Sequence, residues 1–438
     1  MKVKQSNYNF IVNDEKRSKF IIYNSRTGAL ALISQEQIDE LRSFVQEEAK
    51  PEENKLAKQA LACGFIVPKE VDELFYIQSN IMLGRYDTTR LGLTIAPTMA
   101  CNFRCPYCFE SGFHTHGNMS EKVIEKVINL VEKKIKSIKQ MHVSWFGGEP
   151  LLAMPVIEKL TNAFNKLCED NKVKYSASIV TNGYYYTKAN AEKLKALFIN
   201  NVQITIDGPQ EIHDARRFLV DGSPTFSVIM QNLIESKGIL PVSLRINADT
   251  DNIDSVNEVV EYIKANNLSE TVYPYLGLVV NHENAVMYDG NVCLSEDEYS
   301  LQRLKFLQDN DLPVMSLYPR IVRNYCAADS INSYVIDDKG NVTKCWNEIG
   351  NSEFWIGELS NEGFELSNTT PIFNNLSYNP VHDAECRECK LLPICAGGCP
   401  KFRAEGRPQC HPLKGCLEEY LKASADATER LKARLQNK

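Results

Sequence analysis

Cys101, Cys105 and Cys108 follow one another with the spacing C-x3-C-x2-C, so that one short loop carries three thiols. Three thiolates can hold three irons of a [4Fe–4S] cluster and leave the fourth iron open to a small ligand. Zinc is the alternative, but a closed zinc site takes a fourth protein ligand, and the loop itself contains no histidine. We interpret His114 and His116, which follow soon after, as ordinary surface residues. The spacing therefore favours a cluster with an open iron.

A turn made of Gly147, Gly148, Glu149 and Pro150 is the second group that could do chemistry. Two adjacent glycines allow the backbone to approach a ligand closely, and a carboxylate beside them can accept a hydrogen bond from an ammonium group. By themselves, these four residues are equally typical of a simple tight turn. They predict a ligand site only in combination with the cysteine loop.

A denser set of cysteines lies toward the C-terminus, with the spacing C-x2-C-x5-C-x3-C between residues 386 and 399. Gly340 and Cys345 form a G-x4-C pattern upstream of it. A pair of zinc ribbons is the alternative, but such spacing rarely arises by chance. The pattern predicts metal ligation by Cys326, Cys345, Cys386, Cys389, Cys395, Cys399, Cys410 and Cys416. Three further cysteines, Cys63, Cys168 and Cys293, fall outside every pattern and are assigned no function; Cys63 and Cys168 are expected to be buried.

The composition is that of a globular protein, with 438 residues, 43% hydrophobic residues and a net charge of −7. This charge gives no reason to expect nucleic acid or an anionic membrane as a partner. No apolar run approaches the roughly 20 residues that span a bilayer, and the N-terminus has no signal-peptide core. We therefore expect a cytoplasmic protein, in which metal binding explains so large a number of cysteines, 14 in all, better than disulfides do.

Strands and helices that could position these groups alternate between about Leu91 and Val280. The expected strands are Leu91–Ala96, His142–Phe146, Tyr175–Val180, Val202–Ile206, Val242–Ile246 and Val272–Leu278, and helical patterns such as Glu121–Ile135, Val156–Cys168 and Ala189–Phe198 lie between them. Six units of this kind predict a parallel sheet, open or curled into a partial barrel. Ligands in such folds lie at the carboxyl ends of the strands, where the cysteine loop and the glycine turn are found.

The segment before residue 75 reads as a small α+β unit without an obvious catalytic residue. Short apolar strands lead to Ser34 and Gln37, which predict a capping box at the start of a helix. A second helix is expected to end at Gly64. Docking of a partner is a better interpretation of this unit than catalysis.

From about Leu91 to Cys416 the chain resembles the radical S-adenosylmethionine (SAM) superfamily, and within it the subfamily with a SPASM domain. The resemblance implies that the loop cluster chelates the amino and carboxylate groups of SAM through its open iron. It also implies that Tyr107 lies by the adenine and that the Gly147–Pro150 turn binds the SAM amino group. Other implied SAM contacts are Phe109, polar residues by the ribose (Thr181, Asn182, Thr205 and Asp207), and two candidates for the SAM carboxylate (Arg217 and Arg245).

The resemblance further implies two auxiliary clusters in the C-terminal region, and thus three [4Fe–4S] clusters in all. One auxiliary cluster would take Cys326, Cys345 and Cys399, and the other would take Cys386, Cys389, Cys395 and Cys416. A fourth ligand that some family members supply after the Cys326 position is absent here, where Ile331, Asn332 and Ser333 stand. Either Cys410 fills this gap or the first auxiliary cluster keeps an open iron.

The expected fold is thus α/β, with a partial (β/α)6 TIM barrel at residues 90–285 between two smaller domains. Residues 1–80 resemble a winged-helix-like leader-recognition domain, residues 286–320 form a linker, and residues 321–438 form the cysteine-rich SPASM domain with a closing helix.

The resemblance implies a radical SAM oxidoreductase that takes a hydrogen atom with a 5′-deoxyadenosyl radical. The favoured reaction is an intramolecular crosslink in a ribosomally made precursor peptide, a thioether first and a carbon–carbon bond next. The expected partners are the precursor, whose leader binds the N-terminal domain, and a flavodoxin- or ferredoxin-type reductant. The alternatives are an anaerobic sulfatase-maturing enzyme, which forms formylglycine, and an iron–sulfur electron carrier. No residue is assigned as catalytic acid or base.

Overall fold

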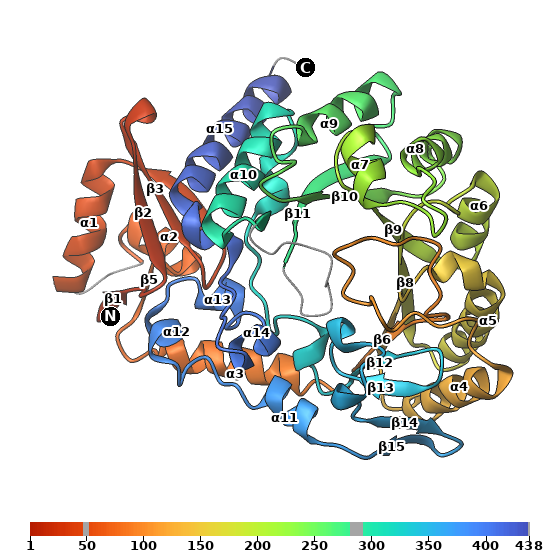
Figure 1. Ribbon diagram of the computed structural model, residues 1–438. Coiled ribbons are helices and arrows are strands. Elements are labelled where there is room, and N and C mark those ends of the chain that lie inside the picture. Colours follow the sequence, from red (N-terminus) through yellow and green to blue (C-terminus); the bar gives the residue numbers. More distant parts are fainter. Residues whose placement is uncertain (47–51, 281–291, 437–438) are drawn as a thin grey trace. The chain divides into compact units, whose positions relative to one another are not determined.

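The computed structural model describes residues 1–46, 52–280 and 292–436 (Figure 1). These residues form two compact units, each of which is discontinuous in sequence. The first contains residues 1–85, 296–326 and 377–438, and the second contains residues 86–295 and 327–376. Residues 321–438 therefore contribute to both units. The predicted limit between barrel and linker, at residues 285 and 286, lies outside the described residues.

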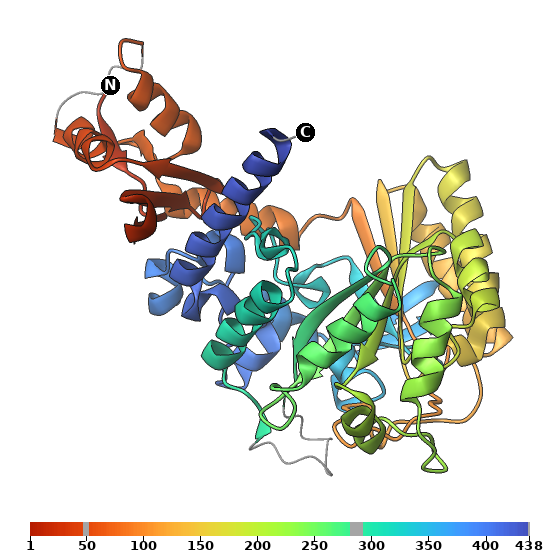
Figure 2. The same ribbon diagram turned by 90° about the horizontal axis from the view of Figure 1, so that it is seen from above.

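The second unit is built on six neighbouring parallel strands in the order β11-β10-β9-β8-β7-β6. The strands are β6 (Arg90–Ile95), β7 (Gln140–Trp145), β8 (Lys174–Thr181), β9 (Ile199–Ile206), β10 (Val242–Ala248) and β11 (Val272–Leu278). The helices that join them are α4 (Glu121–Ile135), α5 (Met154–Asp170), α6 (Lys188–Ala196), α7 (Gln210–Arg216), α8 (Phe226–Glu235) and α9 (Val256–Ala265). Figures 1 and 2 show α4, α5, α6, α8 and α9 along the outer side of the curved sheet. The prediction of a parallel α/β core is confirmed.

Alternation of side chains along the strands explains this arrangement. In β7, Met141, Val143 and Trp145 are buried on the helix-covered face, while His142 and Ser144 point to the opposite face. Successive side chains of a strand point to opposite sides, so the apolar set packs under the helices. The other face, which is the inner face of the curved sheet, carries polar residues in β7.

Four short strands extend the same sheet beyond β6. They are β12 (Ser333–Ile336), β13 (Asn341–Thr343), β14 (Gly357–Ser360) and β15 (Gly363–Leu366), and α11 (Thr370–Leu376) follows them. β12 pairs with β6 in parallel, and the remaining strands are antiparallel. The sequence analysis predicted no strands in this region. Strands of three or four residues are too short to show a period of two, which explains why they were missed.

The first unit contains the predicted N-terminal α+β fold. Its strands are β1 (Val3–Gln5), β2 (Asn9–Asp14), β3 (Lys19–Asn24), β4 (Ala29–Ile33) and β5 (Ile66–Pro68), and its first helices are α1 (Gln35–Gln46), α2 (Lys55–Cys63) and α3 (Glu73–Arg85). β2, β3 and β4 form one antiparallel sheet, and β1 pairs with β5. The capping box is present, since Ser34 N donates to Gln37 Oε1 and Gln37 N donates to Ser34 Oγ. Gly64 ends α2 with φ of 75°.

The C-terminal part of the chain packs within this same unit. It comprises α10 (Glu296–Asp309), α12 (Ala384–Glu388), α13 (Leu392–Cys395), α14 (Pro400–Ala404) and α15 (Leu417–Gln436). Arg17, in the 3-10 turn between β2 and β3, forms ion pairs with Asp426 and Glu429 of α15. A core cluster joins Tyr8, Ile77 and Ile81 to Leu392 and Ala396. The N-terminal fold and the C-terminal helices therefore share one core.

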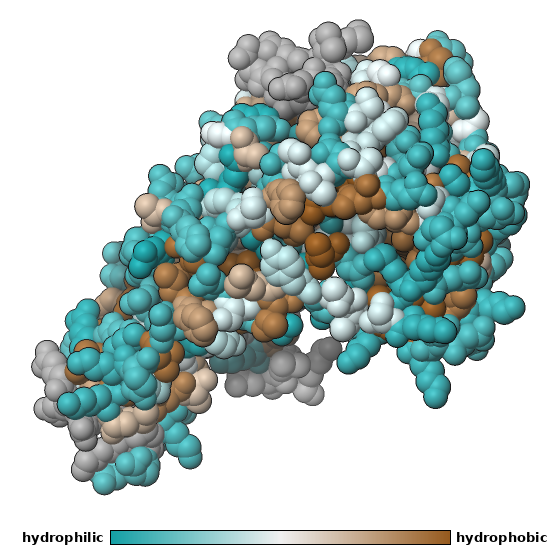
Figure 3. Space-filling model, turned by 90° about the horizontal axis from the view of Figure 1, so that it is seen from below, coloured by the Kyte–Doolittle hydropathy of each residue, from teal (hydrophilic) through white to brown (hydrophobic). Residues whose placement is uncertain are grey.

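The exposed side chains are mainly hydrophilic on the face shown in Figure 3, with apolar residues gathered in a few patches. Within the part of the chain that the structure describes, no helix is both long enough and apolar enough to cross a bilayer.

Candidate functional site

The cysteine loop begins where β6 ends, as the sequence predicts. Within it, Cys108 N donates to Cys105 O at 3.2 Å, and Phe103 N lies 3.4 Å from the Cys101 sulfur. The loop is held from outside by the segment after α7, because Arg104 N donates to Phe218 O at 3.0 Å and Val220 N donates to Asn102 O at 3.0 Å. The backbone thus defines the positions of the three cysteines.

Burial raises the pKa of each thiol in the loop, to about 12 at Cys101. At Cys105 the nearby Arg217 guanidinium opposes the rise, and at Cys108 the Glu110 carboxyl adds to it. Thiols in such a setting bind metal by losing a proton, and a positively charged iron centre is what would hold them as thiolates. The loop fits a three-cysteine cluster site in its donor set.

The two glycines of the Gly147–Pro150 turn are required by the chain itself. A Cβ at Gly147, whose φ is 97°, would lie 2.6 Å from Ala96 Cβ and from Thr98 O. A Cβ at Gly148 would lie 2.3 Å from Ala100 O. The glycines therefore bring this turn against the segment that leads into Cys101. The sequence analysis expected the two glycines to allow close approach to a ligand. In the structure, they allow close approach to the backbone of the segment before Cys101.

Glu149 connects the ends of two strands. Its side chain is 0% exposed and accepts from Thr181 Oγ1 at 2.7 Å, Asn182 N at 2.7 Å and Leu151 N at 3.0 Å. Burial raises the pKa of this carboxyl to about 7, although these hydrogen bonds oppose the rise. Pro150 opens the short 3-10 helix that follows. Glu149, Thr181 and Asn182, predicted separately as SAM contacts, thus form one hydrogen-bonded group.

A second polar group joins residues that are 140 positions apart in sequence. The Tyr107 hydroxyl donates to Asp207 Oδ1 at 2.8 Å and accepts from Arg217 Nη1 at 2.8 Å. Asn247 Nδ2 donates to the same hydroxyl at 3.2 Å and to Asp207 Oδ1 at 3.3 Å. We call these four residues the Tyr107 network. Three of them were predicted from the sequence, and Asn247 was missed, although it lies two residues after Arg245 on the same face of β10.

Two buried atoms of this network have no hydrogen-bond partner. They are Asp207 Oδ2 and Arg217 Nε. Asp207 is 0% exposed, and Arg217 is 8% exposed. Burial raises the pKa of Asp207, while the Arg217 guanidinium opposes the shift. Buried polar groups are nearly always paired in folded proteins, so an acceptor and a donor left open at the ends of parallel strands fit a polar ligand.

Arg245 lies across Gly277 of the neighbouring strand. A Cβ at Gly277 would lie 2.4 Å from Arg245 Cζ, so only glycine leaves room for this side chain. Its guanidinium donates to Asn247 Oδ1 at 2.7 Å and to Leu278 O at 2.9 Å. Thr205 stands beside Arg245 in the strand register. Arg245 therefore extends the Tyr107 network along β10.

Phe109, the residue after the third cysteine, belongs to an aromatic stack. Its ring centroid lies 6.2 Å from that of Phe146, which in turn lies 5.6 Å from that of Trp346. Phe109 also packs against Ala96 and Met99 beneath the loop. Apolar packing is the observed role of Phe109, and its predicted contact with SAM stays a prediction.

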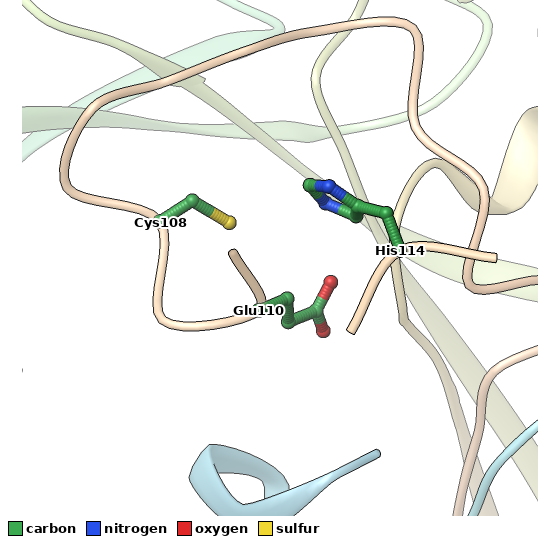
Figure 4. Close-up of side chains that lie close together, drawn as sticks. All are labelled: Cys108, Glu110 and His114. Atoms are coloured by element: carbon green, nitrogen blue, oxygen red, sulfur yellow. The ribbon is translucent and has the colours of Figure 1, made fainter. Parts of the chain in front are cut away.

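Glu110 and His114 are residues that the sequence analysis missed. The ligand atoms of Cys108, Glu110 and His114 lie within 4.8 Å of one another. Figure 4 shows the three side chains side by side. Glu110 is 4% exposed, and burial raises its pKa to about 8. Interpreting His114 as a surface residue was wrong, because it is half-buried beside this carboxyl; His116 is exposed as expected. The signal available in the sequence was an acidic residue two positions after Cys108.

The described C-terminal cysteines of the first unit fall into separate places. Cys326 and Cys399 both lie close to Tyr325. Burial raises the pKa of Tyr325, and the neighbouring thiols raise this pKa further. Cys386, Cys389 and Cys395 occupy the segment from α12 to α13. Cys345 follows β13 and belongs to the second unit.

The chain is similar to several known proteins. Residues 95–278 match the family described as the Radical SAM superfamily. A curated relative, the radical SAM cyclopropyl synthase TigE of Paramaledivibacter caminithermalis, is 23% identical over 68% of this chain and 65% of its own length. This chain therefore spans just under two thirds of that relative. A cysteine-type anaerobic sulfatase-maturating enzyme of Clostridium perfringens is 26% identical over 75% of this chain and 94% of its own length.

Two solved structures share the fold. Streptococcus suis SuiB bound to precursor peptide SuiA matches with a TM-score of 0.53 and 14% identity, covering 94% of this chain and 99% of its own. Native anSMEcpe with bound AdoMet matches with a TM-score of 0.58 and 21% identity, covering 79% of this chain and 99% of its own. At these identities the matches show the fold alone.

Proposed function

We propose that this chain, an enzyme of the radical SAM superfamily whose cofactors include SAM and a [4Fe–4S] cluster, matures a ribosomally made precursor peptide. The proposed reaction is an intramolecular crosslink, a thioether first and a carbon–carbon bond next. The observation that carries the proposal is the N-terminal α+β fold with an open sheet edge, which serves to dock a leader peptide. The proposal also includes two auxiliary clusters, a flavodoxin- or ferredoxin-type reductant as partner, and a location in the cytoplasm.

When bound, SAM and its cluster supply a 5′-deoxyadenosyl radical, and the auxiliary clusters supply an acceptor for the remaining electron. The chain's own residues hold and orient SAM. Cys101, Cys105 and Cys108 hold the cluster. Asp207 Oδ2 could accept from a hydroxyl of SAM and Arg217 Nε could donate to one of its oxygens, which would give both open buried atoms a partner. Glu149 holds the ends of β7 and β8 together through hydrogen bonds. It would thereby position the turn that is proposed to bind the SAM amino group.

The inner face of the sheet supports a peptide as substrate. TIM barrels usually fill this face with branched apolar side chains. Here His142 Nδ1 lies 2.9 Å from Ser176 Oγ, and Ser144 and Ser178 lie 3.2 Å apart beside the other ring nitrogen. Small hydroxyl and imidazole groups can both donate and accept, so they suit the alternating N–H and C=O groups of a peptide backbone.

β2 and β4 are the two edges of this sheet, and each pairs with β3 alone among the described strands. Because α15 contacts β2, we take β4 as the edge that docks a peptide. An extended peptide can add to such an edge through main-chain hydrogen bonds. The structure of SuiB bound to precursor peptide SuiA covers 94% of this chain, against 79% for the structure of anSMEcpe. Its greater coverage supports a shared N-terminal fold.

Sulfatase maturation, with oxidation of a cysteine or serine to formylglycine, is the second candidate. The observation that favours it is the alignment with the Clostridium perfringens sulfatase-maturating enzyme, which spans 94% of that protein. The polar inner face serves this reaction equally well, since its substrate is also a peptide.

An anaerobic assay separates the two candidates. The reconstituted enzyme is incubated with SAM and dithionite, and with either short peptides encoded beside its gene or a peptide from a sulfatase active site. Loss of a pair of hydrogen atoms from a neighbouring peptide, with 5′-deoxyadenosine formed, supports the crosslink. Replacement of the cysteine side chain by an aldehyde in the sulfatase peptide, with the neighbouring peptides unchanged, would overturn it.

The β4 edge is tested by Leu32→Arg, which puts a charge on a side chain that is 39% exposed. We expect about tenfold weaker binding of the precursor, about 1.4 kcal/mol, with peptide-free SAM cleavage unchanged. The control is Ile11→Arg on β2, the opposite edge strand, where the side chain is 41% exposed. Equal loss in both variants would contradict leader docking at β4.

A further inference from the structure

Three side chains of the loop that follows β6 come together, and only one of them is a cysteine. The ligand atoms of Cys108, Glu110 and His114 lie within 4.8 Å of one another. In Figure 4 the Cys108 sulfur and the Glu110 carboxylate are both directed toward the His114 ring. We call these three residues the Cys108 triad. A thiolate, a carboxylate and an imidazole are the side-chain groups that bind zinc in proteins.

The Cys108 triad is formed by turns within one short segment. Cys108 O accepts a hydrogen bond from Ser111 N at 3.0 Å. Glu110 O accepts one from Phe113 N at 2.9 Å. Gly112, between these turns, has φ of 90°, a conformation that favours glycine. The turns lead the chain back on itself, so that the imidazole six residues further along returns to the sulfur.

Two polar atoms of the triad have no hydrogen-bond partner within the described part of the chain. Glu110 is 4% exposed, and its Oε1 atom is buried without a hydrogen bond. His114 Nε2 is buried without one as well. Buried polar groups are nearly always paired, and a buried carboxylate without a partner is costly. A cation bound by the triad would supply a partner for the carboxylate and for a ring nitrogen.

The spacing of the three ligand atoms suits a small ion. Three atoms within 4.8 Å of one another share a point at most about 2.8 Å from each, and shifts of about 0.5–0.8 Å bring them to the distances of about 2.0–2.3 Å at which zinc binds. Three protein ligands leave the fourth position of a tetrahedral zinc ion to water. The SAM cluster, in contrast, would take only thiolates from this loop.

We propose that the Cys108 triad binds one zinc ion in the chain that has not received its SAM cluster. Thiolate and imidazole ligands both suit zinc. The cluster needs the sulfur of Cys108 as well, so zinc bound by the triad keeps the loop from accepting the cluster. The inference concerns the loading of metal and does not depend on the peptide reaction proposed above.

Zinc content tests the site. The full chain, prepared without iron, carries Cys101→Ser and Cys105→Ser, which remove the other two thiols of the loop. His114→Phe, Glu110→Gln or His116→Phe is added to this background, and the four chains are loaded with zinc and dialysed together. His116, exposed on the same loop, is the matched control. We expect about one zinc ion fewer per chain in the first two variants and no change in the third, while zinc at the C-terminal cysteines is common to all four.

X-ray absorption of the bound zinc reports its ligands, because zinc lies about 2.3 Å from sulfur and about 2.0–2.2 Å from nitrogen or oxygen. Zinc held by the Cys108 triad contributes both distances. In His114→Phe and Glu110→Gln the share of the shorter distance should fall together with the zinc content. In His116→Phe it should stay as in the background chain.

Each other outcome counts against the triad. Equal zinc content in all four chains overturns the proposal, and so does an equal loss in His116→Phe. A half-buried histidine can also support the fold of the loop, so Glu110→Gln, which keeps the size of the side chain, is the second variant. Unchanged zinc content in Glu110→Gln overturns the proposal even where His114→Phe loses its zinc. An unchanged share of the shorter distance in both variants does so as well.

Discussion

The cysteine loop after β6 and the cysteine region from α12 to Cys410 are organised by different means. The loop follows a strand of the parallel sheet, and hydrogen bonds within the protein hold the Tyr107 network and Glu149 in place, with Asp207 Oδ2 and Arg217 Nε left open. The α12–Cys410 region has helices of four or five residues, and arginine and lysine point at its sulfurs. A sheet edge can hold a preformed site, whereas thiols on short turns depend on the metal that joins them. The predictions below test this difference.

Iron removal should have the largest effect. After chelation, we expect amide exchange between residues 384 and 410 to accelerate by at least about tenfold, about 1.4 kcal/mol of local stability, because the metal no longer joins the turns. Strands β6 to β11 should keep their protection. Hydrogen exchange with mass spectrometry measures both regions in one sample, and equal acceleration in the two would remove the contrast.

Arg217→Met should destabilise the second unit by about 3–5 kcal/mol, because it leaves the buried Asp207 carboxyl without its cation. Urea unfolding of the iron-free protein measures the change. The control is Arg104→Met, at an exposed residue of the cysteine loop, with an expected change of about 0.5 kcal/mol or less. A small loss in Arg217→Met would mean that the Tyr107 network is not preformed.

Glu149 should make the stability of the second unit depend on pH. Its folded pKa, about 7, lies above the usual value of 4.5, so the folded state holds its proton longer than the unfolded state. Stability is therefore full below pH 4.5 and is lost as pH rises towards 7, by on the order of 3 kcal/mol. Glu149→Gln should remove this slope in unfolding curves between pH 4.5 and 8, and Glu121→Gln, at an exposed site, should retain it.

Gly277→Ala should have the smallest effect. The added methyl group meets the Arg245 side chain, which can move at a cost of about 1 kcal/mol. We expect this cost to weaken SAM binding about fivefold. Calorimetric SAM binding measures this change. In an Arg245→Ala background the same substitution should have no effect, and an undiminished loss there would show that Gly277 acts otherwise.

Much of the fold could be predicted because it depends on local patterns. Helix α4 was predicted with its observed bounds, since Ser120 caps it and its apolar residues repeat at helical spacing. The positions of Tyr107, Asp207 and Arg217 at strand ends followed from the order of strands and loops. Their pairing did not, because no local pattern encodes which strand-end side chains meet. Asn247 and His114 were missed for the same reason.

The continuity between β6 and β12 has a consequence for evolution. Cys101 follows β6, and Cys345 follows β13, which pairs with β12 beside β6. The spacing of these two cysteines is thus tied to strand register rather than to a flexible linker. A one-residue slip turns every side chain of a strand to the other face, so register changes are tolerated in steps of two residues. A change in the separation of Cys101 and Cys345 that preserves this pairing would therefore come in discrete steps of register.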